Sequence, residues 1–193
     1  MFGGLLYKIR AWRYAMRFSR WWINLRFYWY SHEKGGLIFF LIVSLVIGTL
    51  GFVMYYSVSE TTHNRALNCL ALNIYHEARG EPIAGQYAVA EVTMNRVASK
   101  RYPDTVCEVV YQQNWDRLRG RYVGAFSWTE LEAKARLNEK AWRRASRAAE
   151  AVYYGRAAPT VSGALFYHAK YIKPSWAKRK KPVARIGKHI FYK

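Results

Sequence analysis

The chain has 193 residues, a formal net charge of +19, 52% hydrophobic residues and 17% aromatic residues. So much apolar side-chain surface excludes a disordered chain, and two cysteines are too few for a small disulfide-dense scaffold. The length allows one ordinary domain and a modest appendage. The charge indicates a polyanionic partner such as nucleic acid, acidic lipid or an acidic polymer.

Residues 37–56 read LIFFLIVSLVIGTLGFVMYY and carry no charge. As a helix they would span roughly 30 Å, the thickness of the hydrocarbon core of a bilayer. The basic residues before this stretch favour the cytoplasmic side. We therefore predict a cytoplasmic segment (1–35), a transmembrane helix (36–56), a linker (57–64) and an exterior domain (65–193). A buried core helix and a cleaved signal peptide are the alternatives, and a signal anchor fits better because no small-residue cleavage pair follows.

The first 34 residues combine eleven aromatic residues with seven lysines and arginines and one glutamate. This mixture predicts an amphipathic segment that lies on acidic lipid headgroups of the inner leaflet. Interleaved aromatic and basic residues also fit stacking on RNA. The adjoining apolar stretch favours lipid, so we expect no nucleic-acid partner.

The exterior segment is expected to fold as a mainly α (α+β) domain. Apolar residues recur at helical spacing over 65–78 and again over 84–98. A short third helix begins near Pro103, where Thr105-x-x-Glu108 resembles a capping box.

After a loop over 112–126, Ser127-x-x-Glu130 resembles a second capping box and predicts the longest helix of the domain, about 128–154. Gly155 would end it. The β-prone pieces 164–168 and 189–192 predict a small C-terminal hairpin.

Cys69 and Cys107 both lie in the predicted exterior domain. An even number of cysteines in an oxidising compartment allows one disulfide, which would link the first helix to the third. Two buried free thiols are the alternative.

The densest chemistry lies at Tyr75–Pro82, which reads YHEARGEP. Glu77 is at the end of an apolar helix, where a partly desolvated carboxyl group has a raised pKa and can act as a general acid. Arg79 and Glu81 could form an ion pair that shapes the turn. A solvated helix end is the alternative interpretation of all three charges.

No zinc-protease helix is present, because Gly80 occupies the position of the second histidine. His76, His168 and His189 could converge on a zinc ion, but their spacing does not require it. We predict neither a metal nor a cofactor.

Several separated motifs resemble the SleB/CwlJ-like cell-wall hydrolase family, which includes spore cortex-lytic enzymes. They are LALNIYHEARGEPIAGQYAVAEVTMNRV, GALFYHA, Pro174-Ser175-Trp176 and IGKHIFY. The resemblance covers about 65–193 and implies a lysozyme-like fold related to lytic transglycosylases. It implies peptidoglycan (MurNAc-GlcNAc strands) as substrate, Glu77 as the catalytic acid, and Glu81 as a structural or substrate-orienting partner.

Retaining and inverting glycosidases both need a second carboxylate near the catalytic acid, whereas a lytic transglycosylase needs only one acid. Glu81 is the only other acid in the motif, which favours a lytic transglycosylase. A hydrolytic muramidase, an N-acetylmuramoyl-L-alanine amidase and a non-catalytic peptidoglycan-binding protein are the alternatives.

Five further residues are candidates for the substrate groove, and the first two match a Phe-Ser pair that the family tends to carry. They are Phe126, Ser127, Tyr167, His168 and Trp176. Relatives often have glutamine where this chain has Ala125, which removes one expected hydrogen bond. Ser127 could equally cap a helix, and Tyr167 and His168 could pack inside a hairpin.

Residues 156–193 contain ten lysines and arginines and no acidic residue. This tail suits attraction to an anionic wall or membrane surface, and a solvated face is the alternative. The predicted location is the bacterial inner membrane, with the catalytic domain on the periplasmic side. The same pattern fits a chain encoded by a bacteriophage.

Overall fold

The computed structural model describes residues 23–27, 34–117, 119–130 and 137–193. It divides into two compact units, Met1–Val58 and Ser59–Lys193. Most of the predicted amphipathic segment, 1–35, lies outside the described residues.

Helix α2 runs without interruption over Gly35–Ala78. The sequence predicts instead a transmembrane helix at 36–56 and a separate helix at 65–78, joined by a linker at 57–64. The linker residues are helical because the chain contains no glycine or proline between Gly51 and Gly80. By length and composition, α2 could cross a membrane, and all of its large apolar side chains from Leu37 to Val58 except Val43 are exposed.

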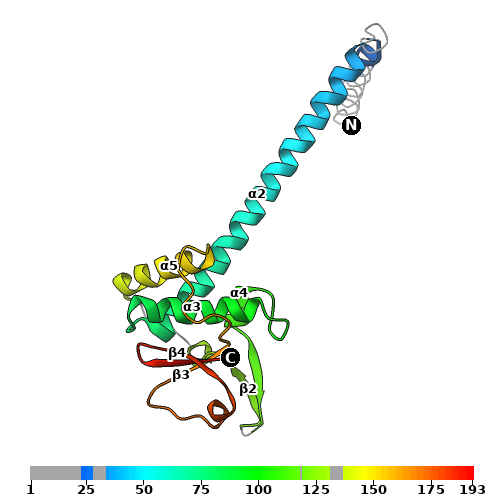
Figure 1. The fold of residues 1–193 in the computed structure, drawn as a ribbon. Helices are drawn as coiled ribbons and strands as arrows, with labels where there is room; N and C mark the ends of the chain where they lie inside the picture. The colour runs from blue at the N-terminus through cyan, green and yellow to red at the C-terminus, as the bar shows by residue number, and fades with distance from the viewer. Residues whose placement is uncertain (1–22, 28–33, 118, 131–136) are drawn as a thin grey trace, which may run out of the picture. The chain divides into compact units, whose positions relative to one another are not determined.

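In the second unit, helices lie on one side and two small sheets on the other (Figure 1). Helix α3 spans Ile83–Val97, and α4 spans Val106–Val110. As predicted, the Thr105 side chain accepts a hydrogen bond from the backbone N–H of Glu108 and caps α4. The largest fully buried apolar side chains come from the C-terminal part of α2, from α3 and α4, and from the last strand; they include Leu70, Ile74, Val89, Val92, Val109, Val110 and Phe191.

The prediction of one long helix over 128–154 is wrong at its start. Ser127–Glu130 forms a short 3-10 helix, η1, and helix α5 spans Glu139–Tyr153 with Asn138 as its N-cap. Residues 131–136 of the predicted helix lie outside the described residues. Glu130 does not complete a capping box, because its carboxylate accepts hydrogen bonds from Gly124 N–H and from Arg121.

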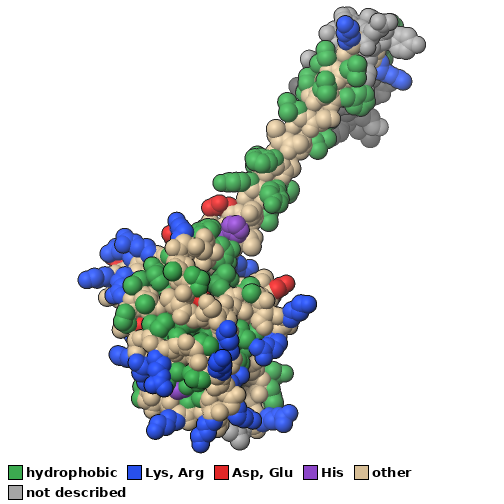
Figure 2. All heavy atoms as spheres, in the orientation of Figure 1, with side chains coloured by type: hydrophobic (Ala, Val, Ile, Leu, Met, Phe, Trp, Pro, Cys, Tyr) green, Lys and Arg blue, Asp and Glu red, His purple; other side chains and the backbone are tan. Residues whose placement is uncertain are grey.

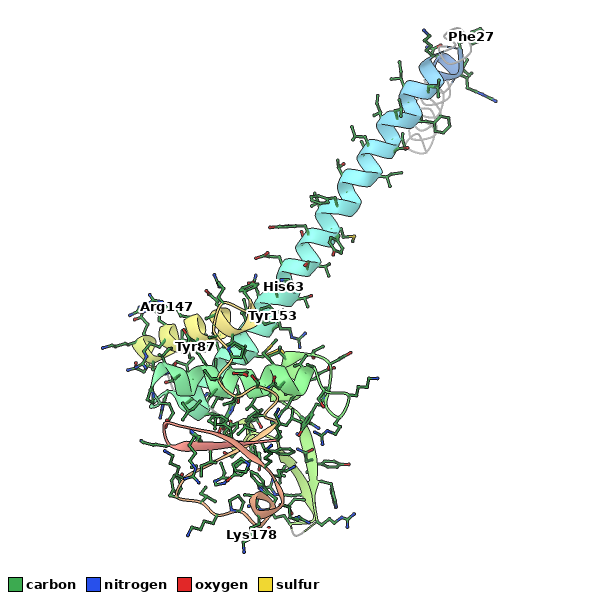
Figure 3. The ribbon with its side chains drawn as sticks, in the orientation of Figure 1. Phe27, His63, Tyr87, Arg147, Tyr153 and Lys178 are labelled. Carbon is green, nitrogen blue, oxygen red and sulfur yellow. A yellow bond between two sulfur atoms is a disulfide. The ribbon has the colours of Figure 1, made fainter. Side chains whose placement is uncertain are left out.

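Helix α5 ends at Tyr153, just before the predicted stop at Gly155, whose φ is +66°. A residue without a Cβ adopts this left-handed conformation with little strain. Buried alanines of α5 pack into the core, namely Ala145, Ala148 and Ala149. The Tyr153 ring contacts the edge of His63 from α2, with centroids 5.9 Å apart (Figure 3).

Strands β1 (Gln113–Asp116) and β2 (Arg121–Gly124) form an antiparallel hairpin. From the sequence, this region is predicted as a loop. The predicted C-terminal hairpin is instead a three-stranded antiparallel sheet with the order β3-β5-β4. Its strands are β3 (Phe166–Ala169), β4 (Pro182–Ile186) and β5 (His189–Tyr192), and a short 3-10 helix, η2 (Ser175–Arg179), precedes β4.

Cys69 and Cys107 form a disulfide, with Cα atoms 5.3 Å apart, that links α2 to α4. The predicted pairing is therefore confirmed. The two cysteines are 38 residues apart in the sequence. Closing a loop of this length stabilises the fold by about 3–4 kcal/mol in the chain-entropy model.

Candidate active site

Glu77 lies in the last turn of α2, and its side chain is turned into the domain. Its Oε2 accepts a hydrogen bond of 3.1 Å from the Tyr167 hydroxyl group of β3. Burial raises the pKa of the Glu77 carboxyl group above its usual value of 4.5; the Tyr167 hydrogen bond and the positive charge of Arg96 oppose that rise without cancelling it. This carboxyl group can therefore hold a proton at a pH where an exposed glutamate is ionised.

The three-stranded sheet positions Tyr167. Tyr167 pairs with Phe191 across β3 and β5, and their ring centroids are 5.7 Å apart. His189 contacts the same tyrosine ring edge to face at 5.4 Å. Burial raises the pKa of Tyr167 well above 10.0, and the charge of Glu77 raises it further. Tyr167 is thus a protonated donor aimed at the carboxylate.

Arg96 of α3 links this sheet to the hairpin side of the site. Its Nε donates to the Leu165 carbonyl oxygen at 2.9 Å, just before β3. Its guanidinium lies over the Phe126 ring at 5.1 Å. The neighbouring Asn95 donates to the Ala164 carbonyl oxygen at 3.1 Å, so two side chains of α3 hold the segment that leads to Tyr167. Arg96 is not among the residues predicted from the sequence.

The residue before Glu77 stacks on a buried tryptophan. His76 lies parallel to Trp128 of η1, with centroids 4.5 Å apart and an interplanar angle of 13°. The Trp128 Nε1–H donates to Asn73, whose amide donates to Thr93, so a buried polar chain joins η1, α2 and α3. Burial and the nearby charge of Arg79 lower the pKa of His76, which favours the neutral imidazole.

Glu81 has a structural position. Its side chain is buried, with 6% exposure, and its Oε2 accepts the Lys188 backbone N–H at 2.8 Å. Gln86 and Arg144 donate to its backbone carbonyl oxygen. The Glu81 carboxylate therefore fastens the β4–β5 turn to the start of α3.

The expected Arg79–Glu81 ion pair does not form. Arg79 donates instead to the Tyr75 hydroxyl group and lies over the Tyr75 ring. The ion pair is absent because the Glu81 side chain is buried against the β4–β5 turn, whereas the Arg79 side chain is exposed.

Tyr167 and His168 lie on opposite faces of the sheet, as alternation along a strand requires. The His168 Nδ1–H donates to the Ala169 carbonyl oxygen at 2.9 Å. The other ring nitrogen, Nε2, then accepts a hydrogen bond from the Tyr192 hydroxyl group at 2.9 Å. Trp176 of η2 contacts both His168 and Tyr192 edge to face. His168 and Trp176 thus belong to an aromatic cluster on the face away from Tyr167.

The other two predicted groove residues differ from each other in exposure. Phe126 is buried, with 4% exposure, and contacts Arg96. Ser127 is exposed at the start of η1. The Thr129 hydroxyl group, rather than Ser127, makes the local side-chain bond, donating to the Phe126 carbonyl oxygen at 2.7 Å.

The histidines considered for zinc do not converge. His168 and His189 face opposite sides of the sheet, and His76 is stacked on Trp128. Among the described residues, no group of three histidine, cysteine or acidic side chains could hold a metal ion.

These observations define a mainly helical domain with a small sheet, in which one partly buried carboxyl group at a helix end accepts a hydrogen bond from a tyrosine of the sheet. Residues 80–192 match the family described as Cell Wall Hydrolase, and the chain belongs to this family. The match begins at Gly80, three residues after Glu77, and therefore does not include Glu77.

The chain is similar to the spore cortex-lytic enzyme of Oceanobacillus iheyensis, with 35% identity over 129 residues, covering 66% of this chain and 41% of that protein. The Bacillus subtilis spore cortex-lytic enzyme is 27% identical over 128 residues, covering 66% of this chain and 37% of that protein. The chain thus spans about two fifths of these relatives.

Two solved structures have a similar fold. The catalytic domain of the germination-specific lytic transglycosylase SleB from Bacillus anthracis matches with a TM-score of 0.52 and 31% identity, covering 66% of this chain and 93% of that chain. The catalytic domain of the Bacillus cereus SleB protein matches with a TM-score of 0.50 and 30% identity, over 67% and 91% of the two chains. The mainly α fold predicted from the sequence is confirmed.

Proposed function

We propose that this chain is a membrane-anchored enzyme that cleaves the MurNAc-GlcNAc glycan strands of peptidoglycan as a lytic transglycosylase. The observation that carries the proposal is the Glu77 carboxyl group, which is partly desolvated, has a raised pKa and accepts a hydrogen bond from the Tyr167 hydroxyl group. Family membership and the likeness to a lytic transglycosylase domain support it.

Protonated Glu77 would give its proton to the glycosidic oxygen as the bond to C1 of MurNAc breaks. The resulting carboxylate would then take the proton from the 6-hydroxyl group of the same sugar, whose oxygen attacks C1 and closes a 1,6-anhydro ring. Glu77 ends the cycle protonated, as it began. Tyr167 and Arg96 would stabilise the carboxylate between the two proton transfers.

The hydrogen bonds of two other carboxylates of the domain, Glu81 and Glu91, support a reaction with one acid rather than two. Glu81 is buried against the Lys188 N–H. The Glu91 carboxylate accepts bonds from the backbone of Thr160 and Val161. A retaining glycosidase needs a free second carboxylate about 5 Å from the acid, and both of these are engaged in holding loops.

Digestion of purified sacculi by the full chain in detergent, followed by mass spectrometry, tests the reaction. A transglycosylase releases muropeptides with 1,6-anhydro ends, whereas a muramidase releases reducing ends. An amidase separates peptides from intact strands. A non-catalytic binding protein is retained on sacculi without releasing products.

The proposed location is the bacterial inner membrane. Residues 1–35 would lie inside on acidic headgroups and 36–56 would span the bilayer. Residues 57–64, which continue helix α2, would join this span to 65–193, which would face the wall. The exposed apolar side chains of α2 and the basic residues before it support this orientation. Lysine and arginine side chains spread over the visible face of the domain, with few acidic ones (Figure 2), which suits an anionic wall polymer.

Replacing Tyr167 by phenylalanine tests the link between this hydroxyl group and the acid. The hydroxyl group stabilises the ionised form of Glu77, so its loss raises the pKa of Glu77 further. Because the acid must be protonated, activity is lost as the pH rises through this pKa. We expect the alkaline limb of the kcat/KM profile to move to higher pH in Tyr167→Phe.

Tyr192→Phe is the matched control, because its hydroxyl group bonds His168 on the opposite face of the sheet. Its alkaline limb should stay at the wild-type position. An alkaline limb that moves equally in both variants, or in neither, would contradict the assigned role of Tyr167.

A further inference from the structure

The β1–β2 hairpin exposes two large aromatic side chains to solvent. Trp115 and Tyr122 are directly opposite each other in the register, and their ring centroids are 5.2 Å apart. They are 55% and 61% exposed. Two adjacent rings on one face of a hairpin offer a large apolar contact area with polar edges, which suits a ligand with flat C–H faces and hydroxyl groups.

Both ends of this hairpin are attached to residues beside Glu77. Tyr111, just before β1, contacts Trp128 edge to face at 5.8 Å, and Trp128 stacks on His76. Phe126, just after β2, lies under Arg96, whose charge acts on Glu77. Trp115 is four residues from Tyr111 and Tyr122 is four residues from Phe126, which is at most about 13 Å along an extended chain.

The direction of the hairpin is fixed by contacts at its base. Gln112 accepts the Ala125 N–H at 2.8 Å, and Glu130 of η1 accepts both the Gly124 N–H and Arg121. Gly124 packs so closely on Thr129 that a Cβ there would overlap the threonine hydroxyl group. The base of the hairpin is therefore held against η1, whose Trp128 stacks on His76, the residue before Glu77.

The charge near the pair fits peptidoglycan. Arg117, Arg119 and Arg121 lie between or within the strands and are exposed. Asp116 and Glu130 neutralise part of this charge by pairing with Arg119 and Arg121. Positive charge beside aromatic rings complements a glycan whose stem peptides carry carboxylates.

We propose that Trp115 and Tyr122 form a distal subsite on which sugar rings of the glycan strand stack, away from the bond that Glu77 cleaves. This inference rests on the proposed function, because it takes the same polymer as the ligand. In this proposal the hairpin binds long glycan strands and positions them relative to Glu77. Fragments too short to reach the hairpin would bind no more tightly because of it.

Binding is measured separately from cleavage by placing every variant in the Glu77→Gln background. Full-length protein in detergent is titrated with purified sacculi, and the bound fraction is read after centrifugation. We expect Trp115→Ala and Tyr122→Ala each to weaken binding roughly three- to tenfold, the amount that one lost aromatic contact supplies. Trp115→Phe should recover most of the loss.

Tyr171→Ala is the matched control, since Tyr171 is an exposed aromatic residue outside the hairpin, with 84% exposure. Peptide-free glycan strands added as competitor should displace the protein, long strands better than disaccharides. Equal binding by the hairpin and control variants would overturn the proposal, as would competition by free stem peptides alone. Cleavage by Glu77→Gln itself would instead refute the proposed function, and the two failures are thereby distinguished.

Discussion

Glu77→Gln is expected to lower muropeptide release from sacculi by roughly 100- to 10,000-fold, the range that a positioned general acid supplies. The amide keeps the shape of the side chain and a hydrogen-bonding oxygen for Tyr167, but it has no proton to give to the glycosidic oxygen. Mass spectrometry of the released products, with initial rates, measures the loss.

The same variant should unfold at a higher temperature than the wild type near neutral pH. Burial raises the pKa of Glu77 in the folded state, so ionisation destabilises the fold as pH rises from the unfolded value of about 4.5 through the folded value. Glutamine does not ionise, so the difference should vanish below the unfolded pKa. If Glu77→Gln loses activity while its stability is unchanged or higher, the loss is due to the missing acid and not to misfolding.

Glu108→Gln is the matched control, because Glu108 is an exposed acid in the first turn of α4. Its rate of release should equal that of the wild type. If Glu77→Gln digests sacculi as fast as Glu108→Gln, Glu77 is not the acid.

Gly187→Ala is expected to destabilise the domain by about 3 kcal/mol, which combines a strained left-handed residue with a displaced buried carboxylate. Gly187 has a φ of +56°, and a Cβ there would overlap Oε2 of Glu81. Glu81 could move aside only by giving up the Lys188 N–H. Urea unfolding of the full chain in detergent, followed by tryptophan fluorescence, measures the change.

Gly155→Ala separates the two contributions, because Gly155 also has a positive φ, +66°, but a Cβ added there would meet nothing within 4 Å. This variant should lose only about 1–2 kcal/mol, the cost of the left-handed conformation. Equal losses at both positions would show that the contact with Glu81 contributes nothing.

The helices of the domain were predictable because their apolar residues recur at helical spacing. Thr105 and Gly155 also marked real ends of helices. The start of α5 was not predictable from Ser127-x-x-Glu130, since Glu130 is drawn to Arg121 and Gly124 of the hairpin. The hairpin was missed because its strands, QNWD and RYVG, lack an alternating apolar face.

For the site, the position of Glu77 before a glycine break was a usable signal for a desolvated carboxyl group. Tyr167 was a candidate too, but its partner 90 residues away could not be read from spacing. Arg96 gave no local signal, because its role depends on Leu165 and Phe126, which are distant in sequence. The burial of Glu81 depends likewise on the β4–β5 turn.

The order of the strands has a consequence for the growing chain. Strand β5 is synthesised after β3 and β4, yet it lies between them, and Glu81 meets Lys188 across 107 residues. During synthesis Glu77 is present long before β5 can place Tyr167 beside it. A partly made domain therefore carries the acid without its tyrosine partner, and the complete arrangement arises only once β5 has been added.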